Sequence, residues 1–155
     1  MKKLIILIIL IFNILLCNAQ KIYNEYSSYS VDIIANIQHG YVYKKNSITS
    51  TDLILYFDGH YLYKLKGSKS YNTLDIIMTY ENGKIYKGRS NMYIDMIANI
   101  KNNKIYNKNS NMYSDVLFTY KNNKVYNGNS ITYDSILLST SNYIHPVIIF
   151  AILFL

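Results

Sequence analysis

Cysteine, proline and tryptophan are nearly absent from this chain. Of its 155 residues, one is cysteine, one is proline and none is tryptophan. The single cysteine, Cys17, excludes both an intramolecular disulfide and a cysteine-based metal site, so the fold has to be stabilised by packing. The single proline, Pro146, comes late in the chain, where it marks a stop. We expect no cofactor and no metal.

Arginine is just as scarce, because Arg89 is the only one. The formal net charge of +7 comes from lysines scattered along the chain rather than gathered in one run. A protein that binds nucleic acid usually concentrates basic residues, arginine above all, on one face. We therefore expect no nucleic-acid partner, and interpret the charge as an aid to solubility.

The first nineteen residues have the pattern of a secretory signal peptide. Lys2 and Lys3 precede a long apolar run, and the small residue Ala19 stands before Gln20. The Ala-Gln-Lys ending is similar to that of many bacterial signal peptides, and it predicts a secreted or periplasmic protein. The alternative is a lipoprotein acylated on Cys17, although Leu16 stands where a small residue is usual.

Residues 20–140 consist of a repeated unit of about twenty residues. The stretches 84–103 and 104–123 match at eleven of twenty positions. An aliphatic residue followed by tyrosine recurs six times, at intervals of 20 residues except for one interval of 23, which contains an insertion between Lys64 and Ser70. The six tyrosines are Tyr23, Tyr43, Tyr63, Tyr86, Tyr106 and Tyr126.

Each unit predicts two antiparallel strands. A serine and then an aspartate follow the tyrosine, and an apolar run rich in β-branched and aromatic residues comes next. Asp134 of the last unit is displaced by one position. The runs end in pairs typical of two-residue type I′ hairpin turns, which need positive φ at both residues. These pairs are His39-Gly40, Asp58-Gly59, Asn82-Gly83, Asn102-Asn103 and Asn122-Asn123.

The predicted fold is all-β: an antiparallel meander of six hairpin units that follows the signal helix. In the longer strand we expect Ile33 and Ala35 on one face and Ile34 on the other, as in a regular strand. Both faces are then partly apolar. The meander should therefore roll up into a barrel or a flower-like radial arrangement, which also removes exposed edges.

The tyrosine-bearing hairpins with Asn-Gly and Asp-Gly turns resemble the four-fold β-flower repeat of uncharacterised secreted bacterial proteins. The resemblance covers residues 21–140 and includes Lys-Ile-Tyr-Xaa-Gly-Xaa-Ser units such as the one that starts at Lys84. It implies the fold alone, because no activity is assigned to such families.

Residues 141–155 depart from the repeat. After Pro146 comes the apolar run Val147–Leu155, which is too short to span a bilayer as a helix. We expect this tail to pack on the repeats as a terminal strand or short helix. The alternative is an interfacial or oligomer contact, because an apolar tail in water is a liability.

No catalytic constellation can be chosen from the sequence. His39, His60 and His145 do not follow the repeat, while serines and aspartates occur in every unit, where they can close the loops by accepting backbone N–H bonds instead of binding calcium. The predicted function is structural or binding, without catalysis. The alternative is a carbohydrate-binding module in which the six tyrosines stack on sugars. Candidate partners are a glycan or a cell-surface protein.

Overall fold

The computed structural model describes residues 19–25 and 27–155, so the expected signal peptide lies outside the described residues apart from Ala19. The described chain is all-β except for one α-helix and six short 3₁₀ helices. The strands are β1 (Gln20–Asn24), β2 (Ile33–Gln38), β3 (Tyr41–Lys44), β4 (Leu53–Phe57), β5 (Tyr61–Lys64), β6 (Ile76–Glu81), β7 (Lys84–Lys87), β8 (Met96–Lys101), β9 (Lys104–Asn107), β10 (Val116–Lys121), β11 (Lys124–Asn127) and β12 (Ile136–Thr140). Helix α2 spans Pro146–Phe154.

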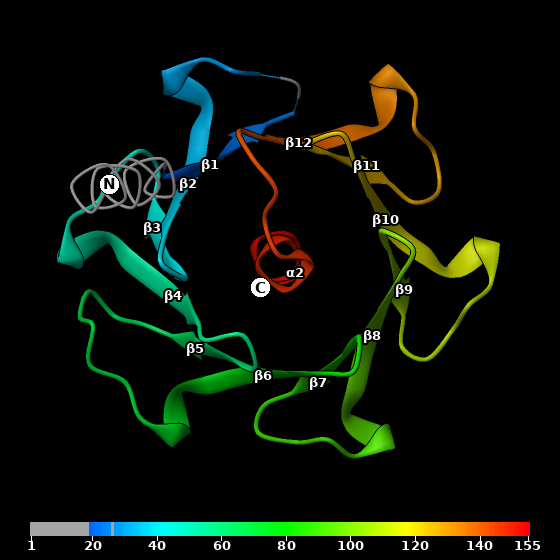
Figure 1. Cartoon of the computed structure of the whole chain (residues 1–155), viewed down its shortest axis with the longest axis horizontal. Helices are drawn as coiled ribbons and strands as arrows, with labels where there is room; N and C mark the ends of the chain where they lie inside the picture. The colour runs from blue at the N-terminus through cyan, green and yellow to red at the C-terminus, as the bar shows by residue number, and fades with distance from the viewer. Residues whose placement is uncertain (1–18, 26) are drawn as a thin grey trace, which may run out of the picture.

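The strands form a closed antiparallel barrel in which every strand pairs with its neighbours in sequence. The barrel closes where β1 pairs with β12, with Ile22 opposite Thr140 and Asn24 opposite Leu138. Figure 1 shows the ring of strands end-on, with loops flaring outwards around it. The predicted six-unit meander is confirmed, and closure leaves no sheet edge to pair with another chain.

The two ends of the barrel differ. At one end, tight hairpins join each longer strand to the next short strand. At the other end, the short strand runs into a loop and a short 3₁₀ helix, which we call a petal, before the next longer strand begins. The 3₁₀ helices are η1 (Ser30–Asp32), η2 (Ser50–Asp52), η3 (Thr73–Asp75), η4 (Tyr93–Asp95), η5 (Tyr113–Asp115) and η6 (Tyr133–Ser135).

Most hairpins have the predicted conformation. Both central residues have positive φ in the turns at His39-Gly40, Asn82-Gly83, Asn102-Asn103 and Asn122-Asn123. The turn predicted at Asp58-Gly59 is wrong by one residue. The backbone N–H of Asp58 bonds the carbonyl of Tyr61 at 3.2 Å, which leaves Gly59 and His60 as the central pair. The Asp58 carboxylate accepts the N–H groups of His60 and Tyr61, and this favours the shifted turn.

The longer strands do not alternate as predicted. Tyr43 pairs with Leu53 and the next pair involves Leu55, so Ile54 is passed over in a β-bulge. Its carbonyl instead accepts the N–H of Leu65 at 2.8 Å. Leu53 consequently packs outside the wall with Tyr43, while Ile54 and Leu55 both join the central core. The same shift occurs in other units. In the first unit Tyr23 pairs with Ile33 and Ile22 pairs with Ala35. In the fifth unit the paired residues of the longer strand are Val116 and Phe118.

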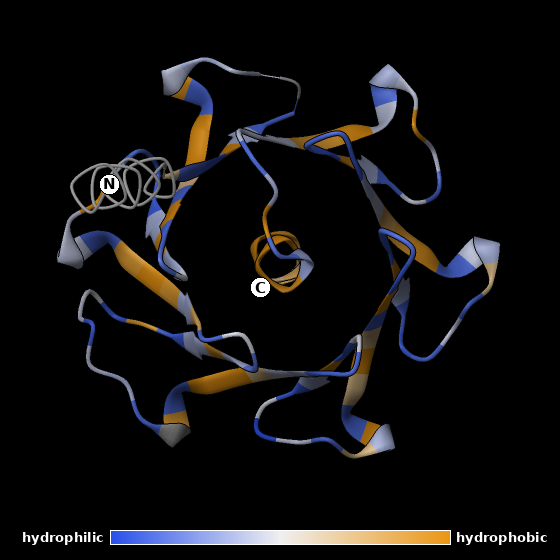
Figure 2. Cartoon of the chain, in the orientation of Figure 1, coloured by the Kyte–Doolittle hydropathy of each residue, from blue (hydrophilic) through white to orange (hydrophobic). Residues whose placement is uncertain are grey.

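Helix α2 fills the centre of the barrel. Its sequence is apolar all round, which suits a helix surrounded by protein. Val147, Ile148, Ile149 and Phe150 are buried in one cluster with the inward side chains of the strands. Figure 2 shows the apolar helix inside the ring of strands. Across the described residues, no helix has both the length and the apolar character needed to cross a membrane.

The helix enters from the hairpin end of the barrel. There the hydroxyl of Tyr120 accepts the N–H of Ile144 at 3.3 Å and lies 3.1 Å from the hydroxyl of Thr140. His145, which precedes the helix, packs against Phe57 in a tilted arrangement and against Tyr80 edge-on, each with a centroid separation of 4.8 Å. The C-terminal part of α2 therefore lies at the petal end.

Acidification should destabilise the protein through His145. Its Nδ1 accepts the Val147 N–H at 3.3 Å, and burial lowers its pKa below the ordinary 6.5. The unfolded state then binds the proton more readily, so stability is full above pH 6.5 and falls as the pH drops below that value. Thermal melting should show this loss as the pH falls below about 6.5.

The variant His145→Asn replaces the imidazole nitrogen with an amide oxygen that can accept the same N–H, and it cannot titrate. It should remove the loss of stability in this pH interval. His39→Asn is the control, because asparagine occupies the same turn position in three other hairpins. A full pH dependence in His145→Asn would contradict the assignment.

Candidate functional site

The six repeated tyrosines lie on the outer face of the barrel wall, under the petals. Tyr43 and Tyr63 pack there with Leu53, Leu65 and Ile76. Five of the six tyrosines are at most 9% exposed, and Tyr23 is half-buried. The structure thus uses these rings for packing between wall and petal, which leaves little ring surface on which a sugar could stack.

The repeated serines and aspartates close the petals. The hydroxyls of Ser47 and Ser90 donate to Asp52 and Asp95, each at 2.6 Å. Hydrogen bonds from Ser47 and Thr49 lower the pKa of Asp52. In the last unit Ser135, rather than Asp134, takes the place of the aspartate: its N–H bonds Thr132 O at 3.1 Å, as the aspartate N–H does in the other units.

Each aspartate is therefore engaged within its own petal. Across residues 19–25 and 27–155, no three His, Cys, Asp or Glu side chains come together in a way that could hold a metal ion.

One position of the longer strand connects the barrel wall to a petal by a hydrogen bond. In five units it carries a small polar residue whose side chain donates to a petal carbonyl. Thr79 bonds Gly88 O at 2.7 Å and Thr119 bonds Gly128 O at 2.8 Å. The other three are Asn36, Asn99 and Ser139. Only the second unit departs from this rule, because Tyr56 stands there.

The departure at Tyr56 coincides with the insertion in the next petal. Tyr56 stacks on Tyr41 at 4.4 Å between centroids, and it packs at a tilt against Tyr71, in the petal that contains the insertion, at 4.9 Å. Tyr63 lies 4.4 Å from Tyr71, and its pKa is raised to about 12 by burial and by the nearby Asp58 carboxylate. Aromatic packing thus replaces the polar tie, and the six-fold repeat is broken at one place.

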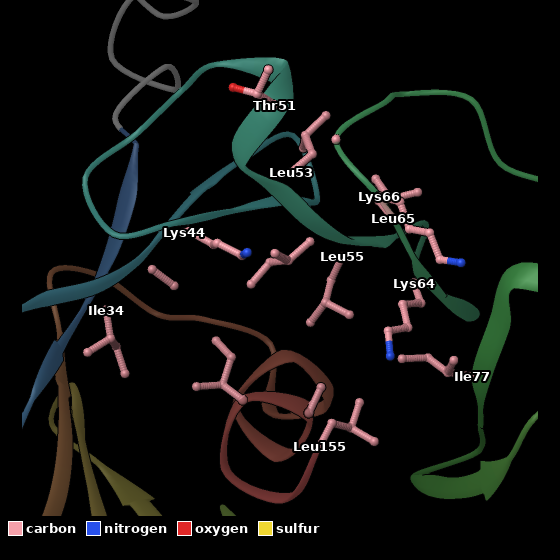
Figure 3. Close-up of a pocket in the computed structure, with 15 residues that line it drawn as sticks. Ile34, Lys44, Thr51, Leu53, Leu55, Lys64, Leu65, Lys66, Ile77 and Leu155 are labelled. Atoms are coloured by element: carbon pink, nitrogen blue, oxygen red, sulfur yellow. The ribbon is translucent and has the colours of Figure 1, made fainter.

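A cavity of about 600 Å³ opens beside this break, between the barrel wall and the C-terminal part of α2. Leu65, Lys66 and Gly67, from the petal that carries the insertion, form part of its lining. Ala35 on β2 and Ala151 on α2 leave room for it, since the equivalent wall residues include Leu55, Met78 and Phe118. Figure 3 shows the lining residues.

The mouth of the cavity is cationic. Lys44 pairs with Ala35 and Lys64 with Leu55, so both lysines belong to the inner face of the wall. In Figure 3 they extend from β3 and β5 toward the cavity. Lys66 is the third basic residue, and the lining contains no carboxylate side chain. The rest of the lining is mostly aliphatic, so the cavity offers apolar walls below a positive rim.

Sequence reasoning missed this cavity, although two signals pointed to it. The insertion between Lys64 and Ser70 broke the repeat, and Ala35 was small where four of the other five units carry large side chains. The lysines at the rim were also visible in the sequence, because the residue that follows the repeated tyrosine is lysine in three units and asparagine in the other three. These residues are Asn24, Lys44, Lys64, Lys87, Asn107 and Asn127.

Comparison with known proteins gives one family. Residues 22–153 match the model of a family described as 6-fold beta flower protein. The four-fold form named from the sequence is therefore corrected to six-fold. Neither curated proteins nor solved structures gave a match.

Proposed function

Since the chain belongs to the 6-fold beta flower protein family, whose repeats build a scaffold, we propose that its function lies where this scaffold departs from symmetry. The protein is a bacterial secreted or periplasmic binding protein without catalytic activity. Its ligand is an amphipathic anion, such as a carboxylate on an apolar chain, held in the cavity beside α2. The observation that carries this proposal is a cavity with aliphatic walls and a lysine rim.

Size and lining support a small ligand. A volume of about 600 Å³ is within the range of ligand pockets, which are mostly apolar with a few polar groups that fix orientation. An apolar chain would lie against Ile34, Leu55 and Ile152 and leave water, which is worth roughly 25 cal/mol per Å² of apolar surface removed.

The charge of the rim favours an anionic head group. The C-terminal end of a helix carries a partial charge of about −0.5, which by itself would repel an anion. Lys44, Lys64 and Lys66 bring three full positive charges to the same cavity. The balance is positive, and it selects a carboxylate over a neutral or cationic head.

Filling the cavity tests the site. Ala35→Leu introduces the side chain that Leu55 and Leu138 carry at the equivalent position, so the barrel should accept it. We expect decanoate, titrated calorimetrically into the protein, to bind Ala35→Leu at least about tenfold more weakly than the native protein. Ala98→Leu is the matched control, since Ala98 occupies the same repeat position and does not line the cavity. Equal decanoate binding by Ala35→Leu and the native protein would disprove the site.

Replacing the rim lysines tests the charge. The double variant Lys44→Asn, Lys64→Asn carries the residue present in three other units. It should weaken decanoate binding and leave decanol binding almost unchanged. Lys87→Asn is the control, because Lys87 has the same repeat position outside the lining. Equal weakening of both ligands would show that the lysines act on the structure and not on the head group.

The location and the lack of catalysis are tested separately. Mass spectrometry of the exported protein should find Gln20 as the first residue. A broad hydrolase panel should show no turnover, and robust activity abolished by one substitution would overturn the non-catalytic assignment.

A further inference from the structure

The outer wall of the barrel carries a second hollow, of about 350 Å³, far along the chain from the insertion. It lies between the β8–β9 hairpin, strand β10 and the sixth petal. Lys104, Thr119, Lys121 and Asn129 are among its lining residues. Lys104 pairs with Thr119 across the two strands, and Lys121 is on the same face of β10 two residues on.

The hollow offers hydrogen-bond donors that lack acceptors. The side-chain nitrogen of Asn129 is buried and has no partner among the described residues. An unsatisfied buried donor is costly, and native structures seldom keep one without a reason. The Thr119 hydroxyl already donates to Gly128 O, so it does not fill this role. The two lysines add ammonium groups, and the lining has no carboxylate.

The lysines are also placed at a cost to stability. Lys101 lies directly opposite Lys104 on β8 and β9, and Lys121 lies directly opposite Lys124 on β10 and β11. Like charges in directly opposed positions destabilise a strand pair. The hairpin that joins the third and fourth units avoids the cost, because Glu81 lies there opposite Lys84.

A matching hollow two units earlier shows that the cationic character is local. Its lining includes Tyr61, Thr79, Glu81 and Arg89, which occupy the repeat positions of Lys104, Thr119, Lys121 and Asn129. That hollow has one acidic side chain, Glu81, beside Arg89 and His60. The later hollow has two basic side chains and an unpaired amide donor. The scaffold is shared, and only the later hollow is suited to an anion.

We propose that the hollow around Lys104, Lys121 and Asn129 binds the oxyanion group of a small polar solute. Lys104 and Lys121 supply the charge, and the Asn129 amide donates the hydrogen bond that it lacks in the free protein. The Lys104 ammonium lies 5.9 Å from the ring centroid of Tyr113, a contact that holds the side chain over the wall. This site is separate from the cavity beside α2 and does not depend on it.

The test uses the isotopically labelled mature protein and follows the Asn129 side-chain amide by NMR. Sodium phosphate and sodium glucuronate are titrated in parallel, with sodium chloride at matched ionic strength as the reference. At least one oxyanion should give a saturable shift that chloride does not. Saturation by phosphate alone indicates a free ion as the ligand, and saturation by glucuronate indicates an acidic sugar.

Two charge-reversal variants distinguish binding at this site from a general effect of the protein's net charge. Lys121→Glu introduces the residue that the third unit carries at this position. Lys45→Glu makes the same charge change on a residue outside the lining, at a repeat position where the first unit carries Glu25. Lys121→Glu should weaken oxyanion binding at least about tenfold, and Lys45→Glu by less than about threefold. Equal loss in both variants, or no saturable shift with either oxyanion, would overturn the proposal and leave only diffuse screening.

Discussion

Removal of residues 146–155 is expected to abolish folding of the barrel. A closed barrel of eight strands is filled by its own inward side chains, and a wider barrel is not. This barrel has twelve strands, and α2 supplies the missing interior. Four large side chains of the helix, Val147, Ile148, Ile149 and Phe150, are at most 5% exposed. Burial of each of these side chains contributes about 1.5–3 kcal/mol to the free energy of unfolding. The four together are therefore comparable with the whole stability of a typical domain, about 5–15 kcal/mol.

Circular dichroism, thermal melting and size-exclusion chromatography check this result. The truncated chain should lack a cooperative transition and should aggregate, because the inward face of the wall becomes exposed. Removal of only Phe154 and Leu155 is the control, since these residues are 51% and 70% exposed and should contribute little. A monomeric truncated protein with an unchanged melting temperature would show that the barrel stands without its helix.

Replacing Gly40 by alanine should cost about 2–5 kcal/mol of unfolding free energy. Gly40 has a φ of +80°, and a Cβ built there would lie 2.3 Å from the carbonyl oxygen of Phe57. Its own carbonyl accepts the N–H of Phe57 at 2.9 Å, so the hairpin cannot move away without losing that bond. Two penalties therefore add: the left-handed backbone and a clash with a neighbouring strand.

Chemical denaturation of Gly40→Ala and Gly88→Asn separates these penalties. Gly88 has a φ of +59°, and no atom lies within 4 Å of a Cβ built there. Lys45 and Lys108 hold the same repeat position with positive φ, which shows that a side chain is tolerated. Gly88→Asn should cost less than about 1 kcal/mol. If both variants lose the same free energy, the contact with Phe57 contributes nothing.

The sequence predicted the barrel because local signals recur in every unit. Pairs such as Asn82-Gly83 specify a tight reversal on their own, and five such reversals in one chain favour a meander that closes. The strand faces could not be predicted in the same way. The bulge at Ile54 depends on a hydrogen bond from Leu65 to its carbonyl, and that donor belongs to the next petal. Strand alternation therefore failed where a contact between neighbouring units decides the register.

The candidate sites lay beyond sequence reasoning for a different reason. The repeated tyrosines stood out because they recur, yet recurrence indicated packing. The cavity depends on Ala35 and Ala151, two small residues far apart in the chain that come together only when the helix enters the barrel. The sequence can show where such a site lies, because the repeat is broken there, as with the insertion after Lys64. It cannot show the shape of the cavity, because that shape follows from packing.

The helix inside the barrel also limits how this gene can change. Repeat genes gain and lose units by recombination between similar segments, and segments such as residues 84–103 and 104–123 are similar enough to exchange. The circumference of a barrel grows with the number of strands, whereas an α-helix has a fixed diameter of about 10–12 Å. An extra unit would leave a gap around α2, and a missing unit would leave no room for it. The helix therefore holds the repeat number at six, and variation is left to the petals and rims.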